Sequence, residues 1–255
     1  MFQKRVVVCL DVRDGKTTKG VKFKGNVDIG DPVEMAREYY LQGVDELVFY
    51  DITASSDRRA IMIDVVKNVA EKIFIPFCVG GGIRSVKDMS DVINAGAEKV
   101  SINSAAVRNP SLIRDGAARY GSQCIVLGMD AERDTSMPSG YRVVIDGGRV
   151  KTGKDMIQWA LEAQNLGAGE IVLNSIDADG TKNGYEITAT RMLSEAVGIP
   201  VVASGGAGIP SHLAEVLTEG KADAALVASM VHYGDYTVSQ IKKELDKAGV
   251  PVRLD

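Results

Sequence analysis

Two aspartates stand at matching places in the two halves of the 255-residue sequence. Asp11 ends the apolar run RVVVCLD (5–11), and Asp130 ends the run QCIVLGMD (123–130). Two carboxyl groups in different surroundings can divide general acid and general base work between them. A single aspartate at a strand end more often caps the following loop, but two at equivalent places favour catalysis. The sequence therefore predicts an acid–base pair.

Glycine-rich and small polar segments form a second matched set. They comprise the glycine-rich residues 80–82 and 204–208, and the pairs Asn103-Ser104 and Ala228-Ser229. Glycine lets backbone N–H groups approach an oxyanion, and a helix N-terminus adds favourable partial charge. We therefore expect two phosphate sites, the second of them lined also by Asp179-Gly180-Thr181.

Eight β-rich apolar runs, separated by helical patterns, must position these groups. The runs span residues 5–11, 46–51, 75–80, 99–103, 123–130, 170–175, 199–204 and 223–228. Nearly continuous apolar runs suit strands buried on both faces of a parallel sheet. Alternating strands and helices over this length predict an α/β fold, specifically a closed (β/α)8 TIM barrel.

Three helix starts are predicted from capping residues between the runs. They are Asp31-Pro32 with Glu34, Asn109-Pro110, and Thr237 with Gln240. An amphipathic stripe also predicts a helix within residues 58–73.

The two halves of the chain repeat each other. Residues 44–53 align with 168–177, and IPFCVGGG (75–82) aligns with IPVVASGG (199–206), both at an offset of 124 residues. Such a repeat predicts two similar half-barrels, approximately residues 1–122 and 123–255, fused into a single domain.

The repeat and the fold together predict the shape of the ligand. In a ring of eight strands, the first and fifth lie opposite each other, and so do the two expected phosphate sites. Active sites of such barrels lie at the C-terminal ends of the strands. An elongated, bisphosphorylated substrate would span this mouth with its centre between the carboxylates.

Charged residues are expected at the opposite end of the strands. Side chains alternate along a strand, so Arg5 shares a face with Asp11, and Lys99 shares a face with Asn103. Glu46 and Glu170 hold matching places in their own strands. Buried charges require partners, so the residues alone indicate a structural ring of salt bridges.

Two long segments flank the expected mouth. Residues 12–31 carry Lys16, Lys19, Lys22 and Lys24, and are expected to form a flexible basic lid over an anion. The segment 131–152 contains a possible small hairpin around 141–145, to which the sequence assigns no role.

Composition excludes several classes of function. The formal charge of −4 gives no electrostatic reason to expect nucleic acid or an anionic membrane as partner. The three cysteines indicate a reducing, cytoplasmic setting, and neither a signal peptide nor a membrane-spanning run is recognisable. His212 and His232 are too isolated to suggest a metal site, and nothing in the sequence requires a cofactor.

Several motifs together resemble the cyclase subunits of imidazole glycerol phosphate synthases. The motifs are KRVVVCLDVRDGKTTKG, DELVFYDITAS, VGGGIRS, KVSINSAAV, GSQCIV, DADGTKNGY, ASGGAG and ADAAL, which are spread over essentially the whole chain. The resemblance implies a reaction of histidine biosynthesis. In it, ammonia and phosphoribulosyl-formimino-aminoimidazole-carboxamide ribonucleotide give imidazole glycerol phosphate and aminoimidazole-carboxamide ribonucleotide.

The resemblance also implies roles for individual residues. It assigns catalysis to Asp11 and Asp130, with Asp11 as general base and Asp130 as general acid, and a mobile-loop role to Lys19. Phosphate contacts fall on Gly82, Asn103, Ser104, Asp179, Gly180, Gly206, Ala228 and Ser229. The resemblance further implies a gate for ammonia at the floor, formed by Arg5, Glu46, Lys99 and Glu170. It implies a glutaminase partner that docks beneath this floor, and the candidates for contact with it are Asp45, Glu98 and Gln123.

Three other functions remain open at this point. The first is the sister ribosyl-formimino isomerase, which shares the half-barrel repeat and the carboxylate pair. The second is a non-catalytic barrel that only activates a glutaminase, and the third is a similar barrel that feeds ammonia into surface-sugar amidination. The segment Thr18-Lys19-Gly20 and the charged floor favour the cyclase over the isomerase.

Overall fold

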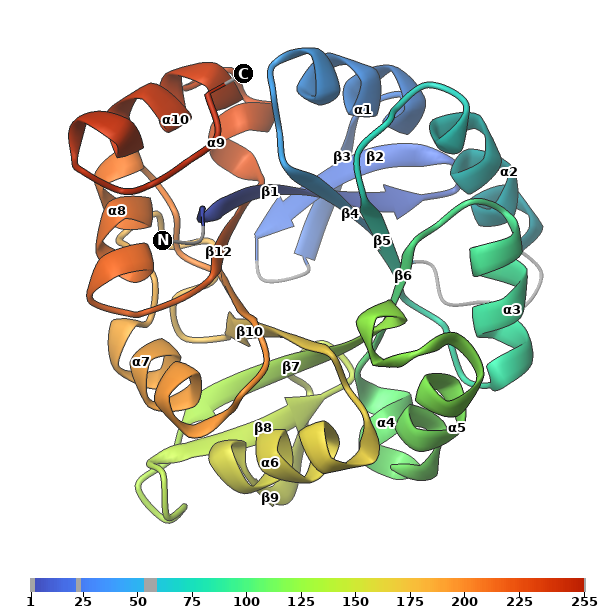
Figure 1. Cartoon of the computed structure of the whole chain (residues 1–255), viewed down its shortest axis with the longest axis vertical. Helices are drawn as coiled ribbons and strands as arrows, with labels where there is room; N and C mark the ends of the chain where they lie inside the picture. Colours follow the sequence, from blue (N-terminus) through green and yellow to red (C-terminus); the bar gives the residue numbers. More distant parts are fainter. Residues whose placement is uncertain (1–2, 22–23, 53–58, 255) are drawn as a thin grey trace.

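The computed structural model describes residues 3–21, 24–52 and 59–254, and shows a ring of strands surrounded by helices (Figure 1). The parallel strands are β1 (Arg5–Arg13), β4 (Glu46–Asp51), β5 (Phe77–Gly80), β6 (Lys99–Ile102), β7 (Ile125–Arg133), β10 (Glu170–Ser175), β11 (Val201–Ser204) and β12 (Ala224–Val227). They pair in this order, and the ring closes where β12 pairs with β1. The predicted (β/α)8 barrel is confirmed.

Helices cover the outside of the ring (Figure 1). They are α1 (Pro32–Leu41), α2 (Arg59–Ala70), α3 (Val86–Asn94), α4 (Ser104–Arg108), α5 (Ser111–Tyr120), α6 (Met156–Leu166), α7 (Ile187–Ala196), α8 (Pro210–Thr218), α9 (Ser229–His232) and α10 (Val238–Lys247). The large apolar core lies between these helices and the strands. None of the helices within the described ranges is long and apolar enough to cross a bilayer.

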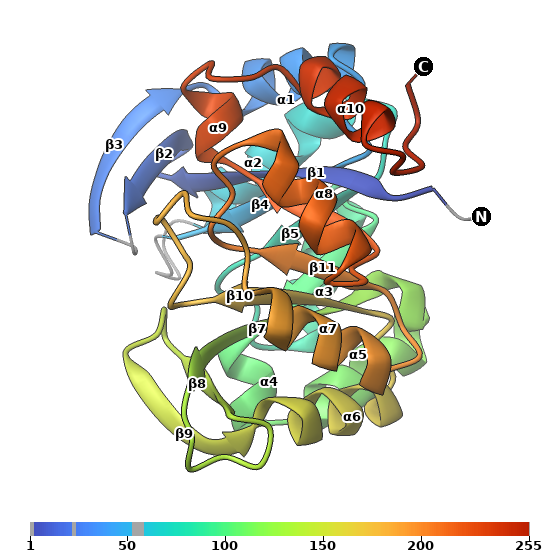
Figure 2. The same ribbon diagram turned by 90° about the vertical axis from the view of Figure 1, so that its left-hand side faces the viewer.

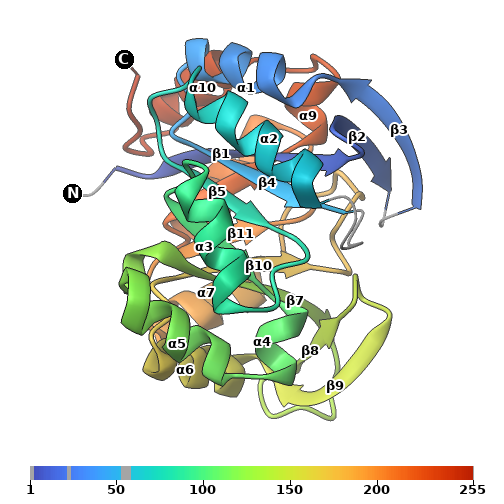
Figure 3. The ribbon, with the colours of Figure 1, turned by 90° about the vertical axis from the view of Figure 1, so that its right-hand side faces the viewer.

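Four further strands extend the barrel at one end of the parallel ring. β2 (Lys16–Val21) and β3 (Lys24–Gly30) continue β1 as an antiparallel ribbon, and β8 (Tyr141–Ile145) and β9 (Val150–Asp155) continue β7 in the same way. Figures 2 and 3 show both ribbons at one end of the barrel, with the chain termini at the other end. We call the ribbon end the mouth and the other end the floor.

The ribbons correct one prediction and support another. The segment 12–31 forms a β-ribbon over its described residues where the sequence predicted a loop, because β1 continues past Asp11 and pairs with Thr17 and Thr18. Both threonines are buried. Lys22 lies outside the described residues, as do residues 53–55 of the DITAS motif, and of Lys19 only the backbone is described, within β2. The hairpin expected around 141–145 is present, because β8 pairs antiparallel with β7 before it and with β9 after it.

The predicted helix caps are confirmed at two places and wrong at a third. Asp31 accepts hydrogen bonds from the backbone N–H groups of Val33 and Glu34 at 2.8 and 3.1 Å. Thr237 and Gln240 form the predicted capping box. Asn109 does not cap α5, because the helix starts only at Ser111, after Pro110, and the Asn109 side chain accepts a hydrogen bond from the Ser111 hydroxyl at 2.8 Å instead.

A smaller apolar cluster fills the inside of the ring. It consists of Val7, Cys9, Val48, Cys78, Val126, Val172, Val202, Ala224 and Leu226, and we call it the inner cluster. Tyr50 and Ala228 pack against it. Because alternate side chains of each strand point inward, this cluster separates the charged residues at the floor from the aspartates at the mouth.

Candidate active site

Asp130 lies on β7 at the mouth, where its carboxyl group is held by two amides. Asn174 Nδ2 donates to Asp130 Oδ1 at 3.0 Å, and Asn103 Nδ2 donates to Oδ2 at 2.9 Å. Asp130 is only 8% exposed. Burial raises its pKa above the ordinary value, and Asp179 adds to this, while the two amide hydrogen bonds act in the opposite direction. The carboxyl group therefore holds a proton more readily than a solvated aspartate.

Asp11 lies directly across the ring from Asp130. Three strands separate β1 from β7 in either direction around the barrel, so the two carboxyl groups occupy opposite sides of the mouth, as the repeat predicted. Asp11 is half-buried, and its Oδ1 atom lies 3.8 Å from Cys9 Sγ. It stands beside Tyr50 of β4 and at the base of the β2–β3 ribbon.

The glycine-rich turns after β5 and β11 share one backbone conformation. Positive φ angles occur at Gly81 (85°) and Gly82 (64°), and again at Gly205 (89°) and Gly206 (102°). A Cβ atom at Gly206 would lie 2.0 Å from the carbonyl oxygen of Gly184, so no larger residue fits there. Close packing within the chain therefore requires glycine at position 206, and the positive φ angles favour glycine at both turns.

The starts of α4 and α9 also match between the halves. Asn103 (φ −123°, ψ −95°) and Ala228 (φ −141°, ψ −79°) adopt the same uncommon backbone immediately before Ser104 and Ser229. Each short helix thus presents its first N–H groups toward the mouth, next to a glycine-rich turn. This pairing of turn and helix start is the arrangement that binds oxyanions elsewhere.

Two of the expected phosphate residues have additional partners. The Asn103 side chain donates to Asp130, and the Ser104 hydroxyl accepts from the backbone N–H of Asp146 at 3.0 Å. Asp179 and Gly180 lie after β10, where Asp179 is close enough to raise the pKa of Asp130. The structure therefore places Asp179, one residue of the second expected phosphate set, near Asp130.

A closed ring of four charges forms the floor. Arg5 bonds Glu46 and also Glu170, the latter at 2.9 Å. Lys99 Nζ lies 2.8 Å from Glu46 and 3.2 Å from Glu170. Cations and anions alternate, which gives every buried carboxylate two cationic partners. Burial and then Glu170 raise the pKa of Glu46, and Lys99 and Arg5 act in the opposite direction.

The three expected interface residues lie just before strands, at the floor end. Glu98 and Gln123 are exposed, although Glu98 accepts from the backbone N–H of Phe77 and Gln123 donates to the carbonyl of Tyr120. Asp45 has internal partners instead: its carboxylate accepts from the Val6 backbone N–H at 2.8 Å and from Lys242 at 2.6 Å. The carboxylate of Asp45 therefore connects β1 with α10 within the chain.

Both histidines form hydrogen bonds within the chain. His232 bonds the Tyr39 hydroxyl at 2.7 Å and the carbonyl oxygen of Cys9 at 2.8 Å, and His212 accepts from the Gly208 N–H. Within the described ranges, no group of three or more His, Cys, Asp or Glu side chains could hold a metal ion.

Asn174 is a site residue that sequence reasoning did not assign. It lies on β10 in register with Asp130, two residues after Val172 and four after Glu170 on the same strand face. Side chains alternate between the two faces of a strand, and the sequence predicted that the strands now labelled β7 and β10 are neighbours. Together these two facts would have placed Asn174 beside Asp130. Tyr50 occupies the corresponding position next to Asp11 and was likewise not assigned.

Fold and site together define a (β/α)8 barrel with two opposed aspartates and two matched pairs of glycine-rich turn and helix start at its mouth, and an ion-pair ring at its floor. The chain matches the model of the family described as histidine biosynthesis protein over residues 5–237. It is 66% identical to a protein of Syntrophobacter fumaroxidans and 67% identical to one of Desulfatibacillum aliphaticivorans.

Those alignments cover 99% of this chain and 99% and 98% of the two relatives. A protein of Desulfosudis oleivorans is 63% identical over 100% of this chain and 99% of its own length. All three relatives are named imidazole glycerol phosphate synthase subunit HisF. The chain belongs to this family of histidine biosynthesis proteins.

Proposed function

We propose that this chain is the cyclase subunit of an imidazole glycerol phosphate synthase. It would use ammonia to convert phosphoribulosyl-formimino-aminoimidazole-carboxamide ribonucleotide into imidazole glycerol phosphate and aminoimidazole-carboxamide ribonucleotide. The observation that carries the proposal is the opposed pair Asp11 and Asp130, flanked by the two oxyanion cradles. The full-length similarity to relatives named as subunits of this synthase supports the same conclusion.

The different surroundings of the two aspartates support a division of roles. Ammonia attacks the ribulosyl carbonyl carbon, and loss of water gives an imine. Asp11, the more open carboxylate, removes a proton during ring closure as general base. Asp130 protonates the departing group during elimination and cleavage, a role supported by the raised pKa that burial gives it.

The phosphate groups of the substrate would bind at the two cradles. In this proposal Gly82, Asn103 and Ser104 hold one phosphate, mainly through backbone N–H groups. The second phosphate is held by residues after β10, β11 and β12, namely Asp179, Gly180, Gly206, Ala228 and Ser229. Since these cradles lie on opposite sides of the ring, the centre of the substrate falls between the aspartates. Lys19 would close over it from the β2–β3 ribbon.

Ammonia would enter through the floor. The ring of Arg5, Glu46, Lys99 and Glu170 surrounds the axis of the barrel there, and we propose that it opens as a gate for ammonia from a glutaminase partner. The exposed Glu98 and Gln123 are candidates for contact with that partner, and Asp45 is the weaker candidate because its carboxylate is internally bonded. The three free cysteines support a reducing, cytoplasmic setting.

The direct test incubates the purified chain with the bisphosphate substrate and an ammonium salt, and follows substrate absorbance and both products by chromatography. The expected result is ammonia-dependent formation of the two products in equal amounts. A parallel incubation with the ribosyl isomer of the substrate tests the isomerase activity. Conversion of the ribosyl isomer without cleavage would contradict the proposal, as would consumption of the substrate that does not depend on ammonia.

A further inference from the structure

The turn between β8 and β9 lies against α4, in the first half of the mouth. It comprises Asp146, Gly147, Gly148 and Arg149. The first three of these residues have φ angles of 56°, 67° and 79°. Glycine adopts such angles freely, but a residue with a side chain, such as Asp146, rarely does so. Contacts outside the turn must therefore hold Asp146 in this conformation.

Two contacts hold Asp146, and both come from one face of α4. The backbone N–H of Asp146 donates to Ser104 Oγ at 3.0 Å, and the guanidinium group of Arg108 donates to the Asp146 carboxylate. Ser104 and Arg108 are four residues apart on this helix, so their side chains are neighbours on its surface. The turn also approaches the residue after β10, since a Cβ atom at Gly148 would lie 3.3 Å from Ile176 Cδ1. The turn is therefore packed between α4 and the end of β10.

The hydrogen bond from Asp146 determines where the Ser104 hydroxyl can donate its proton. A serine hydroxyl has one proton to donate and two lone pairs that accept. The backbone N–H of Asp146 can only donate, so it occupies a lone pair of Ser104 Oγ and leaves the hydroxyl proton for another acceptor. Ser104 is half-buried at the first position of α4, next to Asn103. Its proton is therefore available to an anion at the mouth.

We propose that Asp146 is a positioning residue for the phosphate group that binds at Gly82, Asn103 and Ser104. Its N–H holds the Ser104 hydroxyl so that the hydroxyl proton is donated to a phosphate oxygen, and its carboxylate, neutralised by Arg108, anchors the turn. The β8–β9 ribbon is thereby part of this phosphate site. The inference rests on the proposed function, because it concerns the bisphosphate substrate of that reaction. An exposed ion pair such as that of Asp146 with Arg108 adds little stability on its own, so its loss should affect binding more than folding.

The test measures the KM for the bisphosphate in the ammonia-driven reaction, and its Kd without ammonia, for Ser104→Ala, Asp146→Gly and the double variant. Glycine adopts a positive φ angle without strain, so Asp146→Gly preserves the fold while it removes the anchor. We expect both constants to rise about tenfold in Ser104→Ala, the effect of one hydrogen bond to a charged group, and about fivefold in Asp146→Gly. The double variant should equal Ser104→Ala, because Asp146 acts only through that hydroxyl. Neither kcat nor the KM for ammonia should change.

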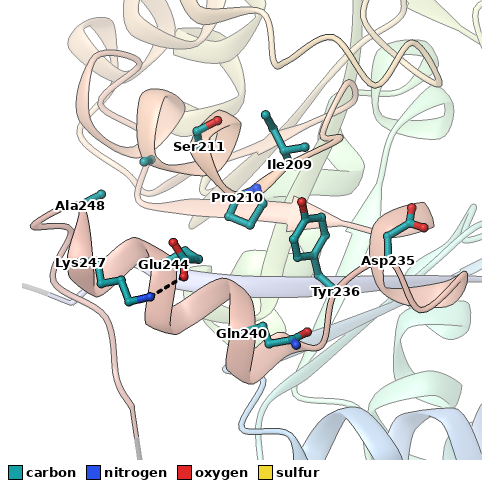
Figure 4. A pocket seen from close by; sticks show the side chains of 10 residues that line it. Ile209, Pro210, Ser211, Asp235, Tyr236, Gln240, Glu244, Lys247 and Ala248 are labelled. Atoms are coloured by element: carbon teal, nitrogen blue, oxygen red, sulfur yellow. Dashed lines mark hydrogen bonds and ion pairs between the residues drawn. The ribbon is translucent and has the colours of Figure 1, made fainter.

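Two further variants separate the anchor from the charge of Asp146. Asp146→Asn should bind the bisphosphate normally, since asparagine tolerates the left-handed backbone and its amide oxygen can accept from Arg108. Arg108→Met breaks the anchor from the other side and should raise both constants at least as much as Asp146→Gly, because the unpaired carboxylate also repels phosphate. Lys247→Met is its control, because it removes another exposed ion pair, that with Glu244, in a groove between α8 and α10 on the outer surface (Figure 4). This control should leave both constants unchanged.

Asp134→Ala tests whether any loosening of the ribbon has the same effect. Asp134 lies in the turn before β8, at the end of this strand away from Asp146, and its carboxylate accepts from Arg142 at 2.6 Å. Removal of this carboxylate should leave the KM and the Kd for the bisphosphate unchanged.

Three results would overturn the inference. A Kd of Asp146→Gly equal to that of the unaltered chain would remove Asp146 from the phosphate site. A double variant that is weaker than Ser104→Ala by the full effect of Asp146→Gly would show that Asp146 does not act through the hydroxyl. An equal weakening in Asp134→Ala would assign the effect to the ribbon as a whole. Binding of the bisphosphate by the unaltered chain without ammonia-dependent turnover would refute the proposed function, while the Kd values would still decide the role of Asp146.

Discussion

The two halves of the mouth carry the same acidic residue, but its neighbours differ. In the second half, Asp130 is buried and accepts hydrogen bonds from Asn103 on one side and Asn174 on the other. In the first half, Asp11 is half-buried and borders the β2–β3 ribbon. Equivalent positions in a repeat have therefore acquired different environments.

The difference can be traced to two positions of the repeat. The offset of 124 residues that aligns 75–82 with 199–206 places Tyr50 where the second half has Asn174. The strand pairing agrees, since Tyr50 is in register with Asp11 and Asn174 with Asp130. Ala228, which has no hydrogen-bonding side chain, is the counterpart of Asn103 before the short helix. The two positions that place carboxamides beside Asp130 therefore hold tyrosine and alanine in the half that contains Asp11.

This contrast supports the proposal that one repeat supplies both an acid and a base. Burial favours the neutral form of Asp130, and the two amides fix its orientation. A catalyst that must both remove and supply protons needs two carboxyl groups with different proton affinities. A perfectly symmetric mouth would give two carboxyl groups with equal proton affinities. The positions at which the two halves differ are therefore the ones that bear on function.

The largest expected effect comes from neutralising either aspartate. Asp11→Asn and Asp130→Asn keep the shape of the side chain but cannot exchange the required proton. We expect each to reduce the ammonia-driven rate about 10²–10⁴-fold, the usual contribution of a general acid or base. Asp115→Asn, on the exposed surface of α5, is the control and should retain full activity. A retained rate in Asp130→Asn would exclude Asp130 from the mechanism.

A smaller effect is expected when one amide beside Asp130 is removed. Asn174→Ala takes away a hydrogen bond that stabilises the charged carboxylate, so the pKa of Asp130 should rise further. If Asp130 is the acid, activity persists to higher pH, and the alkaline limb of the kcat/KM profile shifts to higher pH. We also expect a loss of about tenfold in rate, because one charge-assisted hydrogen bond that orients the acid is missing.

Ser204→Ala is the control for the amide prediction. Ser204 Oγ lies 3.4 Å from Asn174 Oδ1 and therefore contacts the amide on the side away from Asp130. This variant should leave the alkaline limb in place. An alkaline limb that stays fixed or moves downward in Asn174→Ala would show that Asp130 is not the group that must be protonated.

The sequence predicted those parts of the molecule that depend on periodicity and repetition. Eight apolar runs indicated the barrel, and the repeat placed Asp11 opposite Asp130, because strand order in such a ring is fixed by chain order. The β2–β3 ribbon was not predicted because the lysines and glycines of this segment were interpreted as a loop. The alternating residues Val21-Lys22-Phe23-Lys24 and Val27-Asp28-Ile29 were a signal for strands that the interpretation did not use.

Side-chain partners distant in sequence could not be predicted. Asn103 was assigned to phosphate from its place before a helix, but the direction of its carboxamide depends on the packing of β6 beside β7. Asp45 was assigned to an interface, yet Lys242, which is 197 residues away, bonds it. Such contacts depend on how α10 returns to the start of β4, and no local pattern encodes that geometry.

The smallest expected effect concerns stability and compares the two aspartates directly. Burial raises the pKa of Asp130, so the folded chain binds its proton more tightly than the unfolded chain. Stability therefore falls as pH rises from the ordinary pKa to the raised one, and the full penalty applies above it. At pH 7.5 we expect Asp130→Asn to raise Tm by about 2–4 °C, and this gain should vanish as pH falls through the raised pKa.

Asp11→Asn is the matched control for this measurement, because Asp11 is half-buried and the positions equivalent to Asn103 and Asn174 are Ala228 and Tyr50. Its Tm should stay close to that of the unaltered chain. Asn103 can adapt to the new amide in Asp130→Asn, since its own Oδ1 is buried and has no hydrogen-bond partner among the described residues. A Tm of Asp130→Asn below that of the unaltered chain at pH 7.5 would mean that the two amide bonds stabilise the carboxylate by more than its burial costs. The two halves would then differ in orientation of the carboxyl group but not in its preference for a proton.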